Sequence, residues 1–477
     1  MTLLPSKATS KKALKSHSWL GLAVGALLYL ICLSGTVVVI GHEIARWEQP
    51  EQPAIESFSA QSAQQAYSEF ITQYPPTHDV LFMMPGDELP VGYIKSQEAA
   101  RFVQGDGLLT GQVAHPFLDM VTALHVHLHL PHEPGMILVS LTGVVLIALI
   151  VSGILAYRRI KKDAFKARFN HSEQRKHTDI HNRLSVWLSP FHLMFGITGA
   201  FFGLAGLISL VYADLYYEGD TGQLMQDVYG TIPVVESSGE PAKVGNALSH
   251  LKSAFPEFKP VYVNVENAGT PGQHILIGAK LPHRLIYVEQ FRYNSAGEFI
   301  DYVGFSDGEV GRQAIFSVYR LHFGEFAGLA GKVIYLLAGM ALTVVCATGI
   351  NIWLEKRRRL DYLNIMWSAV LWGAPLSLVV NAIIAILSGH APVWAFWAGI
   401  AGVAGVGFIR PAWVVTSKYL LTALSLGLAI LLMINTATFG LCGWIGLSAV
   451  VNVALLVCLC AITARAIRQW FFQPVGA

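Results

Sequence analysis

Seventeen histidines occur in the chain, and four of them stand at the ends of long apolar segments. His17 and His181 lie at the start of two such segments, and His125 and His322 lie just before two others. Imidazole is a strong axial ligand for haem iron, and ionisable side chains within a membrane are costly and usually functional. Two histidines on neighbouring helices can hold a flat macrocycle between them. These positions therefore predict ligation of haem iron.

The first half of the chain repeats itself. His17 precedes Gly35 by 18 residues, and His181 precedes Gly199 by the same interval. Glycines at two further spacings, 8 and 10, recur in the second and fourth apolar segments: Gly135, Gly143 and Gly153, then Gly331, Gly339 and Gly349. An apolar span, an external domain and a returning span thus occur twice from the same side of the membrane. This is a parallel repeat, with its axis expected along the membrane normal.

The repeat predicts how the histidines pair. His17 and His181 are equivalent and meet near the cytoplasm, whereas His125 and His322 are the equivalent external pair. Two haems b at two depths follow from this arrangement. Glycines on the same helices are expected to leave room for the porphyrins: Gly21, Gly25, Gly143, Gly199 and Gly339. The Ser/Thr-Gly pairs in these spans are instead typical of close helix packing.

Two more histidines extend the candidate set. His129 follows His125 by one helical turn, so both face one side if the stretch is helical. His192 follows His181 by 11 residues, about three turns, so these two share a face at different depths. Neither His129 nor His192 has a mate in the repeat. Each is left as an alternative ligand, a propionate partner, or a relay for electrons or protons.

Zinc is the rival metal. His125, His127 and His129 form an HxHxH pattern, but this pattern suits a strand, and no nearby acidic ligand completes an open catalytic site. The sequence also contains no CxxCH, Walker loop, nucleophile elbow or HExxH, and no GxGxxG after a predicted strand. Any haem is therefore not covalently attached, and the chain itself binds neither ATP for pumping nor a nicotinamide or flavin. No catalytic residue is assigned, and nothing points to nucleic acid.

Composition indicates the elements that position these histidines. The chain is 53% hydrophobic and 13% charged, which is typical of a polytopic membrane protein in contact with lipid. Eight apolar segments predict a mainly α-helical bundle of about eight spans, although the crowding of the last four leaves seven possible. The segments are 19–41, 136–157, 184–212, 332–354, 366–388, 393–409, 416–436 and 441–464. The last four have no counterpart repeat, no cluster of polar residues and no assigned role.

Charge gives the orientation. The two long loops, 42–135 and 213–331, hold 26 of the 31 acidic residues, whereas most lysines and arginines lie in the other connections. The positive-inside rule then predicts cytoplasmic termini and two large periplasmic domains in a bacterial inner membrane. Each long loop reads as a small α+β unit: a helix at 61–74 with strands at 79–84 and 91–94, and a helix at 242–255 with strands at 260–266, 274–279, 285–293 and 298–304.

These expectations divide the chain into six parts. The parts are a tail with the first span (1–41), a first periplasmic domain (42–135), the second and third spans with a basic cytoplasmic loop (136–212), a second periplasmic domain (213–331), the fourth span (332–354) and the C-terminal spans (355–477). The periplasmic domains are insertions in a duplicated span–domain–span unit.

Several stretches in order resemble the PepSY-associated transmembrane proteins over most of residues 15–365. They are HSWLGL (17–22), LSGT (34–37), LHVHLHLP (124–131), SGILAYRRIKKDAFKAR (152–168), HNRLSVWLSPFHLMFGITG (181–199) and LHFGEFAG (321–328). The resemblance implies two periplasmic PepSY modules, an inner-membrane location and a link to iron uptake, with some members looking like dihaem reductases of ferric siderophores. The histidines it implies as ligands are His17, His125, His129, His181, His192 and His322.

Residues and resemblance together predict a haem-dependent transmembrane oxidoreductase. Electrons from a cytoplasmic reductase or from quinol would cross the membrane and reduce a periplasmic acceptor, a ferric siderophore or another ferric chelate. Two rival functions stay open at this point: a non-redox membrane binding or regulatory protein with PepSY modules, and a transporter for iron or haem. A spectrum separates the first rival from a cytochrome, and uptake without a reductant identifies the second.

Overall fold

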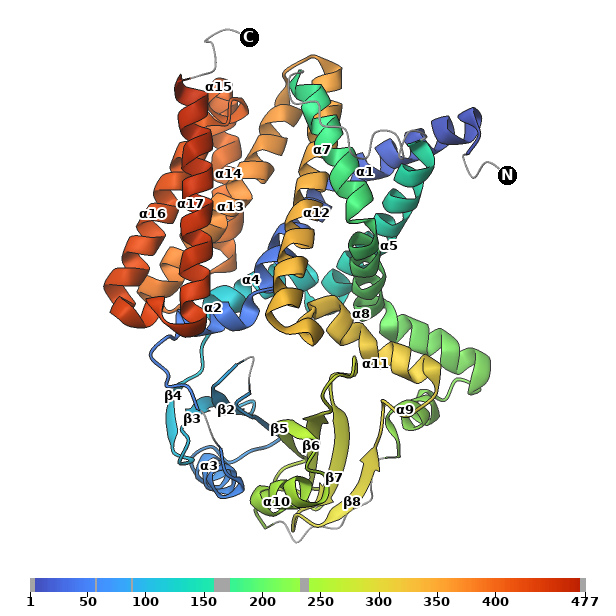
Figure 1. Cartoon of the computed structure of the whole chain (residues 1–477), viewed down its shortest axis with the longest axis vertical. Coiled ribbons are helices and arrows are strands. Elements are labelled where there is room, and N and C mark those ends of the chain that lie inside the picture. Colours follow the sequence, from blue (N-terminus) through green and yellow to red (C-terminus); the bar gives the residue numbers. More distant parts are fainter. Residues whose placement is uncertain (1–4, 56–57, 87–88, 158–171, 232–239, 472–477) are drawn as a thin grey trace. The chain divides into compact units, whose positions relative to one another are not determined.

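Most of the chain is helical, and Figure 1 shows the elements in chain order. The structure is a computed structural model that describes residues 5–55, 58–86, 89–157, 172–231 and 240–471; residues 158–171 of the basic loop lie outside these ranges. The chain divides into two units. We call 1–50, 115–204 and 329–477 the membrane unit, and 51–114 and 205–328 the sheet unit.

The helices that form or enter the membrane unit include seven that are long and apolar enough to span a bilayer, within the described ranges. The expectation of a polytopic membrane protein is confirmed. The eighth expected segment, 393–409, forms a shorter helix of 17 residues. The helices are α1 (Lys7–Val38), α2 (Gly41–Glu48), α4 (Pro116–His127), α5 (His132–Ala156), α7 (Glu173–Trp187), α8 (Ser189–Tyr216), α12 (Gly328–Arg357), α13 (Tyr362–Ser388), α14 (Val393–Ile409), α15 (Pro411–Val415), α16 (Lys418–Phe439) and α17 (Gly446–Phe471).

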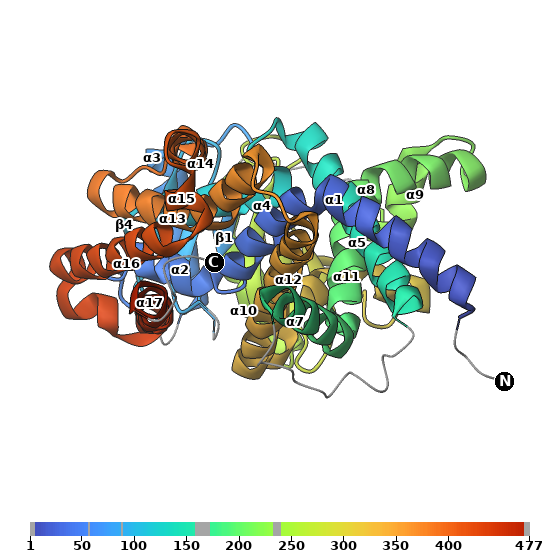
Figure 2. The same cartoon turned by 90° about the horizontal axis from the view of Figure 1, so that it is seen from above.

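Local sequence explains where these helices begin and end. The Ser6 side chain caps α1 by accepting a hydrogen bond from the Thr9 N–H. A capping box formed by Asp361 and Asn364 starts α13. Helix α4 ends at Leu128, which has a positive φ of 54°. Pairs such as α1 with α5 and α16 with α17 pack side by side, as Figure 2 shows.

The third expected span is not one helix. Leu188 interrupts it between α7 and α8, and Pro190 stands at the second position of α8, where its missing N–H is tolerated. The expectation that His181 and His192 share one helix face rested on an unbroken helix. It therefore does not follow from their spacing.

A buried polar network ties the C-terminal helices to the first half of the membrane unit. Trp47 on α2 donates its indole N–H to the Asn452 Oδ1 atom at 2.8 Å. Asn452 on α17 donates to the Asn435 Oδ1 atom on α16, also at 2.8 Å. Asn435 and Asn452 are fully buried. The expectation that these spans lack a polar cluster is wrong, because the asparagines lie on different helices and meet only where α16 and α17 pack.

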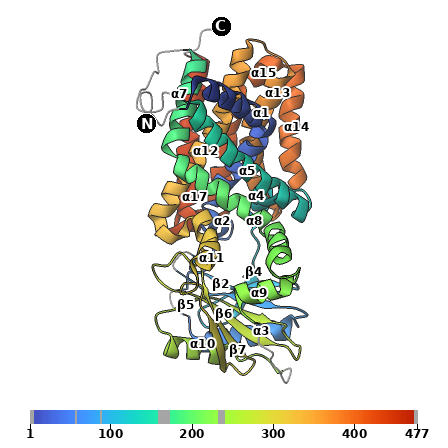
Figure 3. The ribbon, with the colours of Figure 1, turned by 90° about the vertical axis from the view of Figure 1, so that its right-hand side faces the viewer.

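Within the described ranges, the sheet unit contains one antiparallel eight-stranded sheet with the order β4-β3-β2-β1-β5-β6-β7-β8. Figure 3 shows several of its strands with α3 and α10. Its elements are α3 (Ala60–Gln73), β1 (Val80–Met83), β2 (Gly92–Lys95), β3 (Ala100–Val103), β4 (Leu109–Gln112), α9 (Thr221–Tyr229), α10 (Val244–Ala254), β5 (Lys259–Glu266), β6 (His274–Lys280), β7 (Glu289–Asn294), β8 (Phe299–Val303), α11 (Val310–Phe323) and the short turn η1 (Glu325–Ala327). The helices and strands expected from the two long loops are present. The two sets of strands join edge to edge through β1 and β5.

Alternating side chains build the core of the sheet. Phe82 on β1 pairs with Val263 on β5, which pairs with Ile277 on β6, and all three are buried on the face that α3 and α10 cover. Gln64 of α3 donates to the Ala242 carbonyl oxygen and accepts a hydrogen bond from the backbone N–H of Gly245 on α10. The sheet unit is therefore one hydrophobic core built from two copies of a helix followed by four strands.

Candidate functional site

The imidazole of His17 sits against α5. Its Nδ1 atom lies 2.9 Å from the carbonyl oxygen of Leu149 and 3.4 Å from the Ser152 hydroxyl. A methyl group on Gly153 would lie 3.2 Å from the His17 Cε1 atom, so the ring packs closely on the helix backbone at this glycine. Helix α5 thus provides a fitted socket for a histidine carried by α1.

His181 occupies the equivalent socket in the second half. Its Nδ1 atom lies 3.0 Å from the carbonyl oxygen of Val345 and 3.3 Å from the Thr348 hydroxyl, both on α12. A methyl group on Gly349 would lie 3.3 Å from the His181 Cε1 atom. These contacts match those of His17 position for position, as the internal repeat requires.

His125 on α4 makes the same carbonyl and glycine contacts with α1. Its Nδ1 atom lies 2.9 Å from the carbonyl oxygen of Ile31. The ring packs on Gly35, where a methyl group would come within 2.5 Å of the Cε1 atom. The hydroxyl of the preceding Ser34 bonds back to its own helix at the Leu30 carbonyl, 2.8 Å away. This is the tightest of the three sockets.

The three sockets share one local pattern. In each, a carbonyl four residues before a glycine accepts the imidazole N–H, a serine or threonine precedes the glycine, and the glycine lies against the ring. The sequence interpretation assigned the Ser/Thr-Gly pairs to helix packing, and it missed this role. Repetition of the pair at equivalent positions was the available signal.

Other glycines bring helices into close contact, which is the role that the sequence interpretation assigned to the Ser/Thr-Gly pairs. A Cβ on Gly143 would lie 3.0 Å from the Gly196 carbonyl oxygen of α8, and one on Gly339 would lie 2.7 Å from the Thr36 hydroxyl of α1. One on Gly25 would lie 3.0 Å from the side chain of Ile350. These glycines, expected to leave room for porphyrins, instead bring helices into close contact.

The hydrogen bonds determine the tautomer of each ring. A carbonyl oxygen only accepts, so the Nδ1 atoms of His17, His125 and His181 carry the proton and donate. The lone pair of each neutral imidazole is then on Nε2, which is the arrangement of a metal-ligating histidine held by a carbonyl. The ring centroids of His17 and His181 are 6.1 Å apart, with the ring planes at 80°.

Burial favours the neutral form of these rings. It lowers the pKa of His181 to about 4, and the neighbouring His17 ring adds to the effect. Burial also lowers the pKa of His125, although the bond to Ile31 opposes the shift. Both side chains are therefore neutral near pH 7, the form that binds metal ions.

His129 differs from these three. It has a positive φ of 58° just beyond α4, so it does not continue the helix that carries His125. Its Nε2 atom lies 2.8 Å from the Met120 carbonyl oxygen, and its Nδ1 atom accepts the Trp397 indole N–H at 3.1 Å. Both ring nitrogens are engaged in hydrogen bonds. The geometry favours His125 over His129 as the ligand.

His192 on α8 shares two features with the socketed histidines, namely burial and a bond to a backbone carbonyl, but no glycine lies against its ring among the described residues. It is 2% exposed, and it donates to the backbone carbonyl of Ala338 on α12. Its Nε2 atom is buried without a hydrogen-bond partner among the described residues. His192 therefore meets the chemical requirements of a ligand, although it has no mate in the repeat.

The fourth Ser/Thr-Gly pair is Thr198-Gly199 on α8. The Thr198 hydroxyl bonds back to the Met194 carbonyl at 2.7 Å, as the other hydroxyls do. The repeat assigns His322 to this pair, and His322 lies on α11 in the sheet unit. The pairing of His125 with His322 stays a prediction.

The HxHxH stretch does not gather as a cluster. The ring of His127 packs against that of His132, with centroids 5.5 Å apart, whereas His125 faces α1. In the ranges that the structure describes, no three histidine, cysteine, aspartate or glutamate side chains meet as a metal site would require. A centre with two histidine ligands is not covered by this observation.

Comparison with known proteins agrees with the motifs. A family model for the PepSY-associated TM region matches residues 14–356. An uncharacterized protein of Pseudomonas aeruginosa is 28% identical over 256 residues, which cover 51% of this chain. The matched region covers 64% of that relative, so less than two thirds of its length is shared.

Proposed function

We propose a function from the premise that this chain belongs to the family of PepSY-associated transmembrane proteins. It acts as a b-type dihaem cytochrome of the bacterial inner membrane. It moves electrons across the bilayer and reduces a periplasmic ferric chelate such as a ferric siderophore. The observation that carries this proposal is the set of repeated histidine sockets, in which neutral imidazoles are held by backbone carbonyls with the lone pair on Nε2.

The donor set fits haem. A metal ion lies about 2.0–2.1 Å from a ligating imidazole nitrogen, so two imidazoles on opposite sides of one ion have ring centroids about 6 Å apart. The separation of 6.1 Å between His17 and His181 agrees with this value. These two side chains would hold the cytoplasmic haem, and His125 with His322 or His192 would hold the external one. Haem iron supplies reversible uptake of single electrons.

Charge supports the proposed orientation. The regions around the sheet unit carry most of the acidic residues, whereas the connections at the other ends of the spans are basic. By the positive-inside rule both termini are cytoplasmic and the sheet unit is periplasmic. Electrons then enter beside His17 and His181 and leave on the periplasmic side.

A ferric chelate suits the periplasmic end as acceptor. Siderophores bind Fe(III) through hard oxygen ligands, and Fe(II) is a poorer match for them, so one-electron reduction releases the iron. The acidic outer surface favours cationic chelates or the released cation. The joined PepSY sheet would then shape the acceptor site.

An absorption spectrum tests the proposal. We expect protein purified from haem-replete cells to show b-type bands after dithionite reduction, at about two haems per chain, and a ferric chelate to reoxidise them. A non-redox binding protein would be colourless. A transporter would accumulate iron or haem in proteoliposomes without a reductant. Either result would contradict the proposal.

The sockets predict a graded response to added methyl groups. Gly35→Ala places a carbon within 2.5 Å of the His125 ring, so the ring must move and most of the external haem is lost. Gly349→Ala places one 3.3 Å from the His181 ring, which requires a shift of a few tenths of an ångström and retains most haem. Gly402→Ala, where nothing lies within 4 Å, is the control. The measurement is the haem-to-protein ratio; equal losses in all three variants would reject the socket model.

A further inference from the structure

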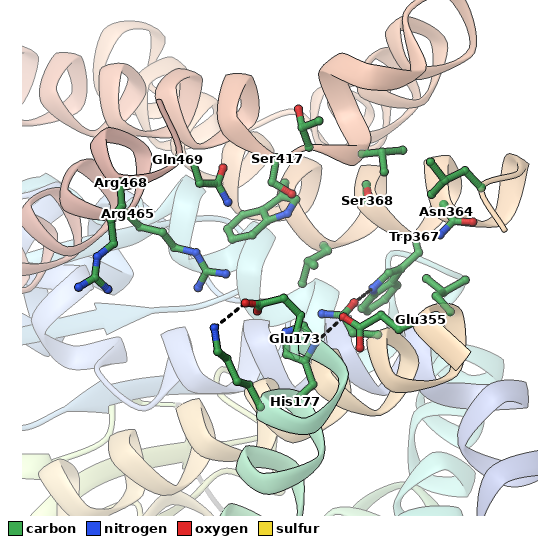
Figure 4. Close-up of a pocket in the computed structure, with 18 of the residues that line it drawn as sticks. Glu173, His177, Glu355, Asn364, Trp367, Ser368, Ser417, Arg465, Arg468 and Gln469 are labelled. Atoms are coloured by element: carbon green, nitrogen blue, oxygen red, sulfur yellow. Dashed lines mark hydrogen bonds and ion pairs between the residues drawn. The ribbon is translucent and has the colours of Figure 1, made fainter. Parts of the chain in front are cut away.

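A large cavity opens in the membrane unit between the C-terminal helices and the histidine-bearing half. Its volume is about 1250 Å³, and α7, α12, α13, α15 and α17 all contribute to its lining (Figure 4). The C-terminal helices had no assigned role from the sequence. This cavity indicates one.

The lining combines aromatic and polar side chains. Trp367 is buried and donates its indole N–H to the Asn351 Oδ1 atom at 2.7 Å. The guanidinium of Arg465 lies over the Trp372 ring, 5.7 Å from its centroid. Arg465 and the exposed Arg468 lie on the other side of the cavity from Trp367 in Figure 4. A flat ring with polar substituents fits such a lining.

A histidine–glutamate pair lies within this cavity. His177 on α7 and Glu355 on α12 are 2.7 Å apart between Nδ1 and Oε1, with 21% and 29% of their side chains exposed. The second carboxylate oxygen of Glu355 is buried and has no hydrogen-bond partner among the described residues. It is an acceptor without a donor, which indicates that a ligand with a hydroxyl group fits here.

The pair is also next to the proposed cytoplasmic haem ligands. His177 precedes His181 by one helical turn on α7, so both lie on one face. Glu355 lies on α12, the helix that provides the socket for His181. The cavity and the histidine pair therefore share two helices, and a ligand in the cavity would lie beside the site where electrons enter.

We propose that this cavity binds the headgroup of a quinol, and that Glu355, positioned by His177, accepts a proton from a ring hydroxyl. The inference rests on the proposed function and names the electron donor. A quinol would reach the cavity from the bilayer, since three of the helices that line it, α12, α13 and α17, are candidate membrane spans. Trp367 contacts the ring, and the unpaired Glu355 oxygen accepts its hydroxyl.

The reaction balances with the groups named. Oxidation of one quinol to its quinone breaks two O–H bonds and releases two electrons and two protons. His17 and His181 would hold the haem that takes up these electrons, since haem iron supplies one-electron chemistry. One proton goes to the Glu355 carboxylate and the other to water on the exposed side of the cavity. The quinone then leaves to the bilayer.

Binding is tested first, without turnover. The full-length protein in nanodiscs, kept reduced with dithionite so that no electrons are transferred, is titrated anaerobically with decylubiquinol while tryptophan fluorescence is followed. We expect saturable quenching, a smaller amplitude in Trp367→Phe, and about tenfold weaker binding in Glu355→Gln, because a hydrogen bond to a charged group is lost. Glu133→Gln is the matched control: Glu133 also pairs with a histidine, His132, at 3.2 Å, but outside the cavity.

Two outcomes overturn the quinol site. One is quenching that does not saturate or that is equal in Glu355→Gln and Glu133→Gln. The other is saturable binding of FMN or ADP that decylubiquinol does not displace, since the exposed arginines would then recognise a phosphate. Anaerobic decylubiquinol separates the two levels of the proposal. If dithionite produces the reduced haem bands and decylubiquinol does not, the quinol site is wrong and the proposed function stands. If neither reductant produces haem bands, the proposed function is wrong even when the cavity binds the quinol.

Discussion

His17→Ala and His181→Ala each lower the haem content from about two to about one per chain. The two ring centroids lie 6.1 Å apart, so loss of either side chain removes one of the two histidines that would hold the cytoplasmic haem. The external haem keeps its ligands, because His125 sits in a separate socket on α1. The reduced-minus-oxidised spectrum and a haem-to-protein ratio measure the result.

The matched control is His390→Ala, at an exposed position outside all three sockets, which keeps both haems. His322→Ala should show the reverse loss, with the cytoplasmic haem retained. The pairing is wrong if either cytoplasmic variant loses both haems or neither. Thermal stability measured beside haem content separates ligand loss from unfolding, since a misfolded variant would lose both haems and melt early.

His125→Ala removes the external haem, whereas His129→Ala keeps it. The two histidines are four residues apart, and the sequence left open which of them is the ligand. In the structure His125 donates from Nδ1 to the Ile31 carbonyl oxygen, which places its lone pair on Nε2, whereas both nitrogens of His129 form hydrogen bonds, with Met120 and Trp397. His129→Ala then costs about 1 kcal/mol of stability for each hydrogen bond lost.

Haem content and thermal stability, measured on the same samples, give opposite patterns for these two variants. His125→Ala loses haem, and His129→Ala loses stability while retaining the spectrum. Trp397→Phe is a matched control for His129, because it removes the hydrogen bond at Nδ1 and leaves the ring in place. If His129→Ala loses the external haem and His125→Ala keeps it, the socket does not identify the ligand.

The repeated socket explains why the internal repeat of histidines and glycines is visible in the sequence. Each histidine must meet a carbonyl, a hydroxyl residue and a glycine on a partner helix, and these three lie within five residues of one another. Because the span–domain–span unit is duplicated, Ser152-Gly153 and Thr348-Gly349 occupy equivalent positions in the two copies. Helix geometry fixes the spacing between the carbonyl, the hydroxyl residue and the glycine along one helix, so this spacing can be recognised in the sequence.

The sequence by itself determined the membrane character, the family, the candidate histidines, and the helices and strands of both long loops. These depend on local composition and periodicity. Only the tertiary structure decided which glycines lie against histidine rings and which allow two helices to pack closely. The role of each glycine depends on which part of the partner helix lies opposite it. It also joined β1 to β5, paired Asn435 with Asn452, and brought His177 to Glu355, since each contact connects residues of different elements and has no periodic signature in the sequence.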